Sequence, residues 1–115
     1  KKINNYLNIN TLIAISSNLN IDHNLKAQDK VLNICNKYKC TEYWNVYAGY
    51  DLYSIKKFNA QKIQLNFLEP DKNILYDQKS HNFIPNLSIL DVIMHNSKDQ
   101  IKTLLTKYHV INSEC

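Results

Sequence analysis

The chain has 115 residues, of which 44% are hydrophobic and 21% charged, as in an ordinary folded domain rather than a disordered segment. Its net charge of +4 comes from lysine without any arginine, which disfavours nucleic acid as a partner, because arginine forks usually read phosphates and base edges. No apolar run reaches the roughly 20 residues of a membrane span, and Lys1-Lys2 precedes no signal-peptide core, so we expect a cytoplasmic location.

The first part of the chain predicts a strand, a helix and a second strand. The continuous apolar run Thr11–Ile15 fits a strand buried on both faces. Apolar residues between Ala27 and Tyr38 recur at helical spacing, with lysine and other polar residues on the remaining faces. Glu42–Tyr47 is rich in aromatic and β-branched residues and predicts the second strand.

A short helix and a third strand follow. The helix is expected to start near Ser54, and Lys62–Leu68 alternates apolar and polar residues as a strand does. Residues 71–86 then form a long polar connection, and long connections inside compact domains are commonly functional or disordered.

Two helices complete the prediction. Leu87–Met94 is a short apolar helix in which Ser88 and Asp91 have the spacing of a capping box. The last helix starts at a Ser97 cap and buries apolar residues as far as Tyr108.

The order of these elements predicts an α/β fold for residues 1–115, taken as a single domain with a three-stranded, mostly parallel sheet and flanking helices. Such a narrow parallel sheet leaves a hydrophobic edge exposed and needs a cover on both faces. We therefore expect it to be part of a larger doubly wound sheet, completed by a missing N-terminal half or by a partner chain over the sheet edge.

The cysteines and histidines predict no metal site. Cys35, Cys40 and Cys115 make an odd number, and a cytoplasmic protein keeps such thiols reduced. The spacing between Cys35 and Cys40 is wider than in a zinc knuckle, and a second ligand pair is missing. The four histidines show no metal-ligand spacing. We interpret the thiols as packing or surface groups.

Three groups of residues follow the predicted strands and indicate a shared substrate-binding site. Ligands of open parallel sheets bind beyond the carboxyl ends of the strands. Ser16 and Ser17 follow the first strand, Gly49 follows the second, and the connection carrying Tyr76 and Gln78 follows the third. Gly49 would allow a positive φ or a close approach of the backbone to a ligand, or it is simply a turn glycine.

Further substrate-binding candidates lie around the predicted helix and the second strand. Lys26 and Lys30 occupy adjacent turns at a helix start, where the amides also attract anions, so they could hold a phosphate or carboxylate. The alternative is a solvated lysine face. We add Asn45 and Tyr53, whose ring could stack on a sugar, although core packing explains most of this aromatic-rich stretch.

Ser88 and Asp91 allow two interpretations. Both could fix the helix start as a capping pair worth about 1 kcal/mol. Alternatively, Ser88 contacts substrate, and Asp91 is a catalytic residue that acts as a general base or orients an amine near Gln78. We favour the cap for Ser88 and leave both interpretations of Asp91 open.

Several stretches together resemble the WbqC-like protein family of bacteria. They are Ser16–Leu19 with Lys26–Leu32, the glycine-bearing Tyr47–Tyr53, and Tyr76–Gln78 with the most specific stretch, Phe83–Val92. The chain departs from the family pattern at Asp29 and Lys30, where Glu and Arg are usual, and at Ser54, where Asp is commoner. Family members open with a Gln-Pro-x-Phe-x-Pro-like segment that this chain lacks, so we expect it to be the C-terminal portion of a longer protein.

The resemblance implies a doubly wound fold and a role in the biosynthesis of surface polysaccharides such as the O-antigen. It implies a transferase, or a module of one, that moves glycine or another acyl group to an amino sugar. The small-molecule partner would be a sugar nucleotide or an activated acyl donor, and no resident cofactor is evident. The alternative is a non-catalytic subunit that binds a sugar nucleotide or a protein.

Overall fold

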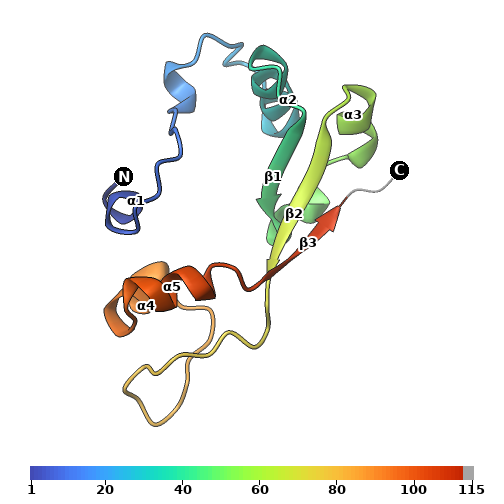
Figure 1. The fold of residues 1–115 in the computed structure, drawn as a ribbon. Helices are drawn as coiled ribbons and strands as arrows, with labels where there is room; N and C mark the ends of the chain where they lie inside the picture. The colour runs from blue at the N-terminus through green and yellow to red at the C-terminus, as the bar shows by residue number, and fades with distance from the viewer. Residues whose placement is uncertain (113–115) are drawn as a thin grey trace. The chain divides into compact units, whose positions relative to one another are not determined.

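The computed structural model describes residues 1–112 and divides the chain into two compact units (Figure 1). Unit 1 contains Lys1–Leu12 and Pro70–His109, and unit 2 contains Ile13–Glu69 and the residues from Val110 onward. The expectation of one domain over the whole chain stays a prediction.

Most of the sheet and its helices belong to unit 2. The elements are η1 (Ser16–Asn18), α2 (Ala27–Lys37), β1 (Glu42–Val46), η2 (Tyr47–Leu52), α3 (Ile55–Ala60), β2 (Gln64–Pro70) and β3 (Tyr108–Asn112), the last two lying partly in each unit. In unit 2, the helices predicted between Ala27 and Tyr38 and near Ser54 are confirmed, and so are the second and third predicted strands. Of the helices in residues 1–112, none combines the length and apolar character needed to cross a membrane.

Three helices end in the same turn, although glycine is nearly absent from the chain. After α1 (Lys2–Tyr6), α2 and α3, the residue in the left-handed conformation is Asn8, Lys39 and Lys62, with φ of 57°, 53° and 58°. In each case two backbone bonds close a Schellman turn, such as that from the Cys40 N–H to the Cys35 carbonyl at 2.8 Å. The turn therefore forms here without the glycine that usually relieves its strain.

The Schellman turns also join each helix of unit 2 to its following strand. This turn brings the residue after the left-handed one against the last turn of the helix. Cys40 thus lies beside Cys35, and Ile63, whose N–H donates to the Phe58 carbonyl at 3.1 Å, lies beside Phe58. The chain enters β1 and β2 directly from these contacts.

The core of unit 2 covers one face of the sheet. β1 and β2 are parallel, and the register pairs Tyr43 with Leu65 and Asn45 with Phe67, so these side chains share one face. The buried cluster lies against that face; it consists of Leu32, Cys35, Phe58, Ile63, Leu65 and Phe67. On the opposite face of β1, Trp44 and Val46 are exposed, Val46 to 59%.

The strand predicted at Thr11–Ile15 is wrong. These residues form neither helix nor strand, and the Leu12 side chain is 93% exposed. A strand persists only where a neighbour accepts and donates its backbone hydrogen bonds. In the sheet of the described residues, the strand order is β1-β2-β3, and the outer edge of β1 has no neighbour. Thr11–Ile15 therefore pairs with no strand in this sheet.

The prediction of a mostly parallel sheet is only partly right, because β1 and β2 are parallel but β3 is antiparallel. The third strand comes from the segment that was predicted as the end of the last helix. That helix, α5 (Lys98–Leu104), ends before Leu105, and Tyr108 opens β3. The Asp71 N–H donates to the Lys107 carbonyl at 3.2 Å, which holds the chain before β3 beside the end of β2. A tertiary hydrogen bond outweighs the helical periodicity here.

Unit 1 contains α1, α5 and α4 (Ile89–His95). The cap predicted at Ser97 is confirmed, and it is one half of a capping box: its hydroxyl accepts from the Gln100 N–H at 3.3 Å, and the Gln100 side chain accepts from the Ser97 N–H at 2.8 Å. Ile101, one turn later, is fully buried. The Lys98 ammonium lies 4.5 Å from the centre of the Tyr6 ring, a cation–π contact between α5 and α1.

The thiols within the described residues are free, as predicted, whereas Cys115 lies outside those residues. Cys35 is buried and Cys40 partly buried. Burial, with the neighbouring Cys40 as a smaller cause, raises the pKa of the Cys35 thiol to about 11.

Substitution of two leucines by alanine tests the assignment of core and surface. We expect Leu65→Ala to lower the free energy of unfolding by about 2–5 kcal/mol, because Leu65 is fully buried. Leu12→Ala removes the same atoms from an exposed position and should change the free energy of unfolding by less than about 0.5 kcal/mol. Urea unfolding measures both. Equal losses would instead support the buried strand at Thr11–Ile15.

Alkylation with iodoacetamide near neutral pH tests the two thiols. Because only thiolates react, we expect Cys40 to be modified before Cys35, whose pKa is raised to about 11. The protonated Cys35 contributes stability below its ordinary pKa of 9.0, and this contribution is lost as the pH rises through about 11. Peptide mass spectrometry follows each thiol, and Cys40→Ala serves as the control for Cys35. Faster labelling of Cys35 would contradict its burial.

Candidate functional site

One hydrogen-bonded cluster in unit 1 fastens the long connection after β2 to helix α4. The Tyr76 hydroxyl donates to Oδ2 of Asp91 at 2.5 Å. The Gln78 Nε2 lies 3.3 Å from the same carboxylate oxygen and 3.3 Å from the Tyr76 hydroxyl. The structure therefore brings together Tyr76, Gln78 and Asp91, three of the residues predicted for the site.

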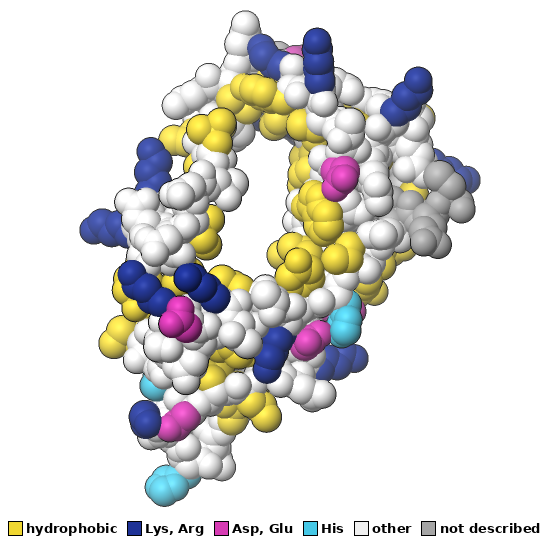
Figure 2. Space-filling view, in the orientation of Figure 1, with side chains coloured by type: hydrophobic (Ala, Val, Ile, Leu, Met, Phe, Trp, Pro, Cys, Tyr) yellow, Lys and Arg dark blue, Asp and Glu magenta, His cyan; other side chains and the backbone are white. Residues whose placement is uncertain are grey.

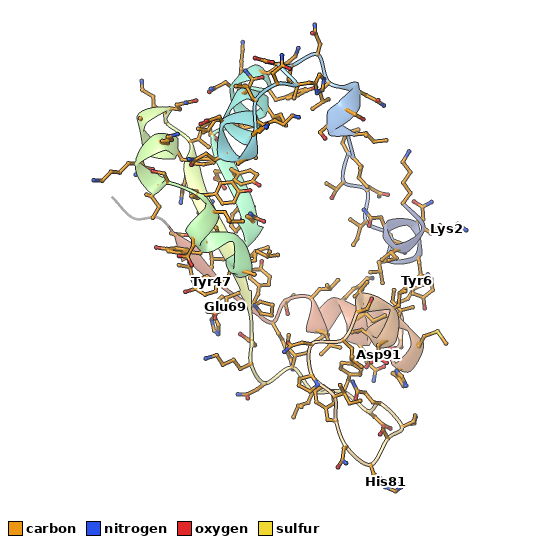
Figure 3. All side chains as sticks on the ribbon, turned by 180° about the vertical axis from the view of Figure 1, so that it is seen from behind. Lys2, Tyr6, Tyr47, Glu69, His81 and Asp91 are labelled. Atoms are coloured by element: carbon orange, nitrogen blue, oxygen red, sulfur yellow. The ribbon has the colours of Figure 1, made fainter. Side chains whose placement is uncertain are left out.

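Gln78 also closes the loop that contains His81. Its Nε2 donates to the Ile84 carbonyl at 2.9 Å, and its Oε1 accepts from the Ile84 N–H at 2.8 Å. The side-chain amide thus pairs with Ile84 as a main-chain amide would. Next to it, Asp77 accepts from the Lys79 N–H at 2.8 Å and pairs with the Lys79 ammonium at 2.7 Å. His81 lies at the far tip of the loop (Figure 3).

The electrostatics of the cluster keep Tyr76 a donor. Burial and, next, the hydrogen bond to Asp91 raise the pKa of the Tyr76 phenol, while the bond from Gln78 acts in the opposite direction. The phenol therefore stays protonated at neutral pH. Oδ2 of Asp91 in turn accepts from both Tyr76 and Gln78.

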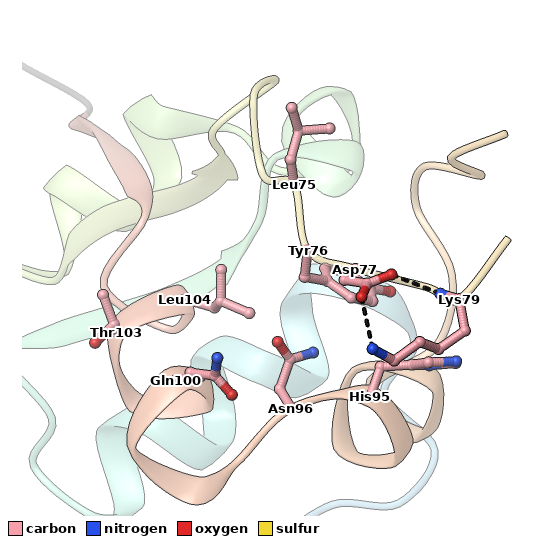
Figure 4. A pocket seen from close by; sticks show the side chains of 9 residues that line it. All are labelled: Leu75, Tyr76, Asp77, Lys79, His95, Asn96, Gln100, Thr103 and Leu104. Atoms are coloured by element: carbon pink, nitrogen blue, oxygen red, sulfur yellow. Dashed lines mark hydrogen bonds and ion pairs between the residues drawn. The ribbon is translucent and has the colours of Figure 1, made fainter. Parts of the chain in front are cut away.

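A pocket of about 380 Å³ opens beside this cluster (Figure 4). Its walls come from the connection, the end of α4 and helix α5; they are formed by Leu75, Tyr76, Asp77, Lys79, His95, Asn96, Gln100, Thr103 and Leu104. Tyr76 also borders a second pocket of about 210 Å³, where its ring and that of Phe83 make a T-shaped contact at 5.4 Å between centres. The hydrogen-bonded cluster thus shapes the wall of the larger pocket.

Ser88 serves as the cap of α4. Its hydroxyl accepts from the Leu90 N–H at 3.2 Å. The Asp91 side chain turns to Tyr76 and Gln78, so no reciprocal capping pair with Ser88 forms among the described contacts. Substrate binding by Ser88 stays a prediction.

Asn45, Gly49 and Tyr53 lie together in unit 2. The φ of Gly49 is not positive; an added Cβ would lie 2.8 Å from Asn45 Nδ2, so the end of the Asn45 side chain would have to move, and 3.6 Å from the Tyr53 ring, an ordinary contact. The Tyr53 hydroxyl lies 3.3 Å from that of Tyr43, and its ring packs edge-on against Phe58. Core packing accounts for these contacts, and substrate binding by the three stays a prediction.

The remaining predicted residues also belong to unit 2. Lys26 is the N-cap residue of α2, without a side-chain cap, and the Lys30 ammonium donates to the His23 carbonyl at 3.3 Å. Ser16 and Ser17 lie in η1, and no strand precedes them, so the argument that they follow a strand end does not hold. Their role in substrate binding stays a prediction.

His95 is a pocket residue that the sequence analysis did not select. Its Nδ1 lies 2.9 Å from the Asp91 carbonyl oxygen and 3.5 Å from Asp91 Oδ1. The available signal was the spacing of four residues between Asp91 and His95, which places both on one face of a helix. The spacing of the four histidines fits no metal site, and the sequence alone therefore gives His95 no role.

Within residues 1–112, no cluster of three or more histidine, cysteine, aspartate or glutamate side chains could hold a metal ion. On the face drawn in Figure 2, the lysine side chains are dispersed over the surface rather than gathered in one dense patch.

The chain is an α/β protein with a polar pocket beside a Tyr–Gln–Asp cluster. The sequence profile described as the WbqC-like protein family matches residues 1–103, which include every residue of this pocket except Leu104. The chain therefore belongs to the WbqC-like protein family. Comparison with curated proteins gave no match, and comparison with solved structures gave none either.

Removal of one hydroxyl tests the cluster. We expect Tyr76→Phe to lower the free energy of unfolding by about 1.5–3 kcal/mol, the usual range for a hydrogen bond to a charged group. Because the pKa of Tyr76 is raised, the phenol contributes stability below the ordinary tyrosine pKa of about 10. Above that pH, the difference in the free energy of unfolding between Tyr76→Phe and wild type should become smaller.

Tyr38→Phe is the matched control, since Tyr38 is 53% exposed. Urea unfolding at neutral pH and above pH ~10 measures both variants against wild type. If Tyr76→Phe and Tyr38→Phe lower the free energy of unfolding equally at neutral pH, the hydrogen bond from Tyr76 to Asp91 does not stabilise the protein.

Proposed function

We propose that the chain is a transferase, or part of one, that moves glycine or another acyl group to the amine of an amino sugar in surface polysaccharide or O-antigen biosynthesis. Membership of the WbqC-like protein family supports this proposal. The observation that carries it is the pocket of about 380 Å³, with the Tyr76–Asp91 cluster in its wall.

The pocket suits a small polar acceptor. Binding sites for small molecules commonly measure about 300–1,000 Å³. Asn96, Gln100 and Thr103 offer amide and hydroxyl groups to the hydroxyls and amine of a sugar, and Leu75 and Leu104 offer apolar surface. Acyl transfer then requires the amine to be held close to the activated carbonyl in a fixed orientation.

Asp91 acts in this proposal as a positioning residue. Its Oδ2 already accepts hydrogen bonds from Tyr76 and Gln78, which leaves that oxygen little capacity to take a proton from a substrate. The carboxylate instead fixes the tyrosine ring that forms the pocket wall. A general-base role for Asp91 stays a prediction.

Lys26 and Lys30 are proposed as ligands for the anionic groups of a sugar nucleotide or acyl donor. Lys30 donates to the His23 carbonyl and retains two further N–H groups for a phosphate. Both lysines lie at the start of α2, where the first backbone N–H groups also favour an anion.

A second candidate is a non-catalytic subunit that binds a sugar nucleotide or a protein. The open outer edge of β1 and the exposed Trp44 and Val46 favour it, because a protein partner could pair with that edge. In either case we expect an N-terminal half or a partner chain to cover this edge.

The transferase is tested with the full chain, a uridine-diphosphate-linked amino sugar and an activated glycyl donor. We expect mass spectrometry to detect the sugar nucleotide carrying one added glycyl group. Asp91→Asn should lower the rate about tenfold or more, since a lost or misplaced hydrogen bond of about 1.4 kcal/mol has that effect. Asp51→Asn, at an exposed position in η2, is the control and should not change the rate.

Two outcomes speak against parts of this proposal. Undiminished turnover by a folded Asp91→Asn variant would contradict the positioning role. Calorimetric binding of the sugar nucleotide without turnover of glycyl, acetyl or formyl donors would favour the binding subunit. Lys26→Ala, measured in the same calorimetric titration, separately tests anion binding at α2.

A further inference from the structure

The hydrogen-bond partner of His95 decides which of its ring nitrogens carries the hydrogen. Nδ1 lies 2.9 Å from the Asp91 carbonyl oxygen, and a carbonyl oxygen can only accept. Asp91 Oδ1, 3.5 Å away, is also only an acceptor when ionised. Nδ1 therefore donates, and Nε2 of the neutral ring retains a free lone pair.

His95 differs in this respect from the other histidines. The His23 Nε2 lies 2.9 Å from the Leu19 carbonyl oxygen and therefore carries the hydrogen. The His109 Nε2 is held 2.7 Å from Asp71 Oδ1. His81 lies at the loop tip and does not line the larger pocket (Figure 3). His95 lines that pocket with a side chain that is 24% exposed.

The amides next to His95 complement a nucleophile that carries hydrogens. The Asn96 Nδ2 donates to the Val92 carbonyl at 2.9 Å, which leaves its oxygen as an acceptor. The Gln100 oxygen is used by the Ser97 N–H, which leaves its Nε2 as a donor. Figure 4 shows both side chains in the wall with His95. These two amides thus offer an acceptor for an amine or hydroxyl and a donor.

We propose that His95 Nε2 is the general base of this pocket, taking a proton from an amine or hydroxyl of the bound acceptor. The inference rests on the proposed transferase and names its base. The acceptor nitrogen or oxygen forms a bond to the acyl carbon, and the bond from that carbon to the donor's leaving group breaks with its electrons. The proton passes to Nε2 and then to the leaving group.

The surroundings hold the imidazole for this role. The Asp91 carbonyl fixes the ring through Nδ1, and the Asp91 carboxylate stabilises the imidazolium formed when Nε2 takes the proton. The Tyr76 ring lies 6.4 Å from the imidazole, between centres. The other charged groups in the pocket wall are Asp77 and Lys79, which neutralise one another in an ion pair.

The tautomer is tested without any substrate. Long-range proton–nitrogen NMR spectra of the full chain distinguish a protonated Nδ1 from a protonated Nε2. We expect His95 to carry its hydrogen on Nδ1 and His23 to carry its own on Nε2. A hydrogen on Nε2 of His95 would overturn the proposal.

Catalysis is tested with His95→Asn, whose amide nitrogen occupies the place of Nδ1. This variant retains a donor for the Asp91 carbonyl and lacks Nε2. We expect unchanged unfolding, a KM near that of wild type and a kcat about 10²–10⁴-fold lower. His81→Asn is the matched control with unchanged kcat. If His95→Asn retains full kcat, His95 has only a structural role and the proposal fails.

Absence of turnover by the wild-type protein would overturn the proposed function. Reaction with diethyl pyrocarbonate tests the free Nε2 of His95 independently of turnover. This reagent acylates a ring nitrogen that has a free lone pair. Its product therefore reports the tautomer: we expect peptide mass spectrometry to show modified His95, and proton–nitrogen spectra of the product to place the acyl group on its Nε2, whereas in His23, whose Nε2 carries the hydrogen, the acyl group should be on Nδ1. An unmodified His95, or one that carries the acyl group on Nδ1, would overturn its assignment as a base.

Discussion

The hydrogen bond from the Tyr76 hydroxyl to Asp91 organises the candidate site. A connection as long as residues 71–86 loses much conformational entropy when it is ordered, and a charge-assisted bond of 2.5 Å offsets part of that cost. Gln78 joins the same carboxylate and closes the loop at Ile84, so one acidic side chain anchors the segment twice. The pocket beside it depends on this anchor, because Tyr76 is part of its wall.

The same aspartate connects the anchor to the proposed chemistry. Its carboxylate holds Tyr76 and Gln78, while its main-chain carbonyl orients the ring of His95 one turn later. Any residue at this position keeps the main-chain carbonyl that orients His95, so a substitution such as Asp91→Asn changes only the side-chain carboxylate. The sequence makes Asp91 a catalytic candidate, and its contacts favour a positioning role.

Part of the site could be read from the sequence, and part could not. Tyr76, Gln78 and Asp91 were selected from strand ends and motif resemblance, and the structure brings them together. His95 was missed because a ring nitrogen becomes a candidate base only when its partner is known, and that partner is a carbonyl oxygen. The sequence allows Gly49 a positive φ, a close approach to a ligand or a simple turn, whereas its φ is not positive and the Asn45 side chain lies against it.

The sequence by itself determined the elements whose stability is local. Helical periodicity predicts α2, alternation predicts β2, and the cap at Ser97 predicts the start of α5, because these depend on residues a few positions apart. Tertiary structure decided which β-like segments became strands. Thr11–Ile15 lacks a neighbour and stays irregular, while Tyr108–Asn112 joins the sheet beside β2 and runs antiparallel. A strand exists only where another chain segment completes its hydrogen bonds, and that partner lies far away in the sequence.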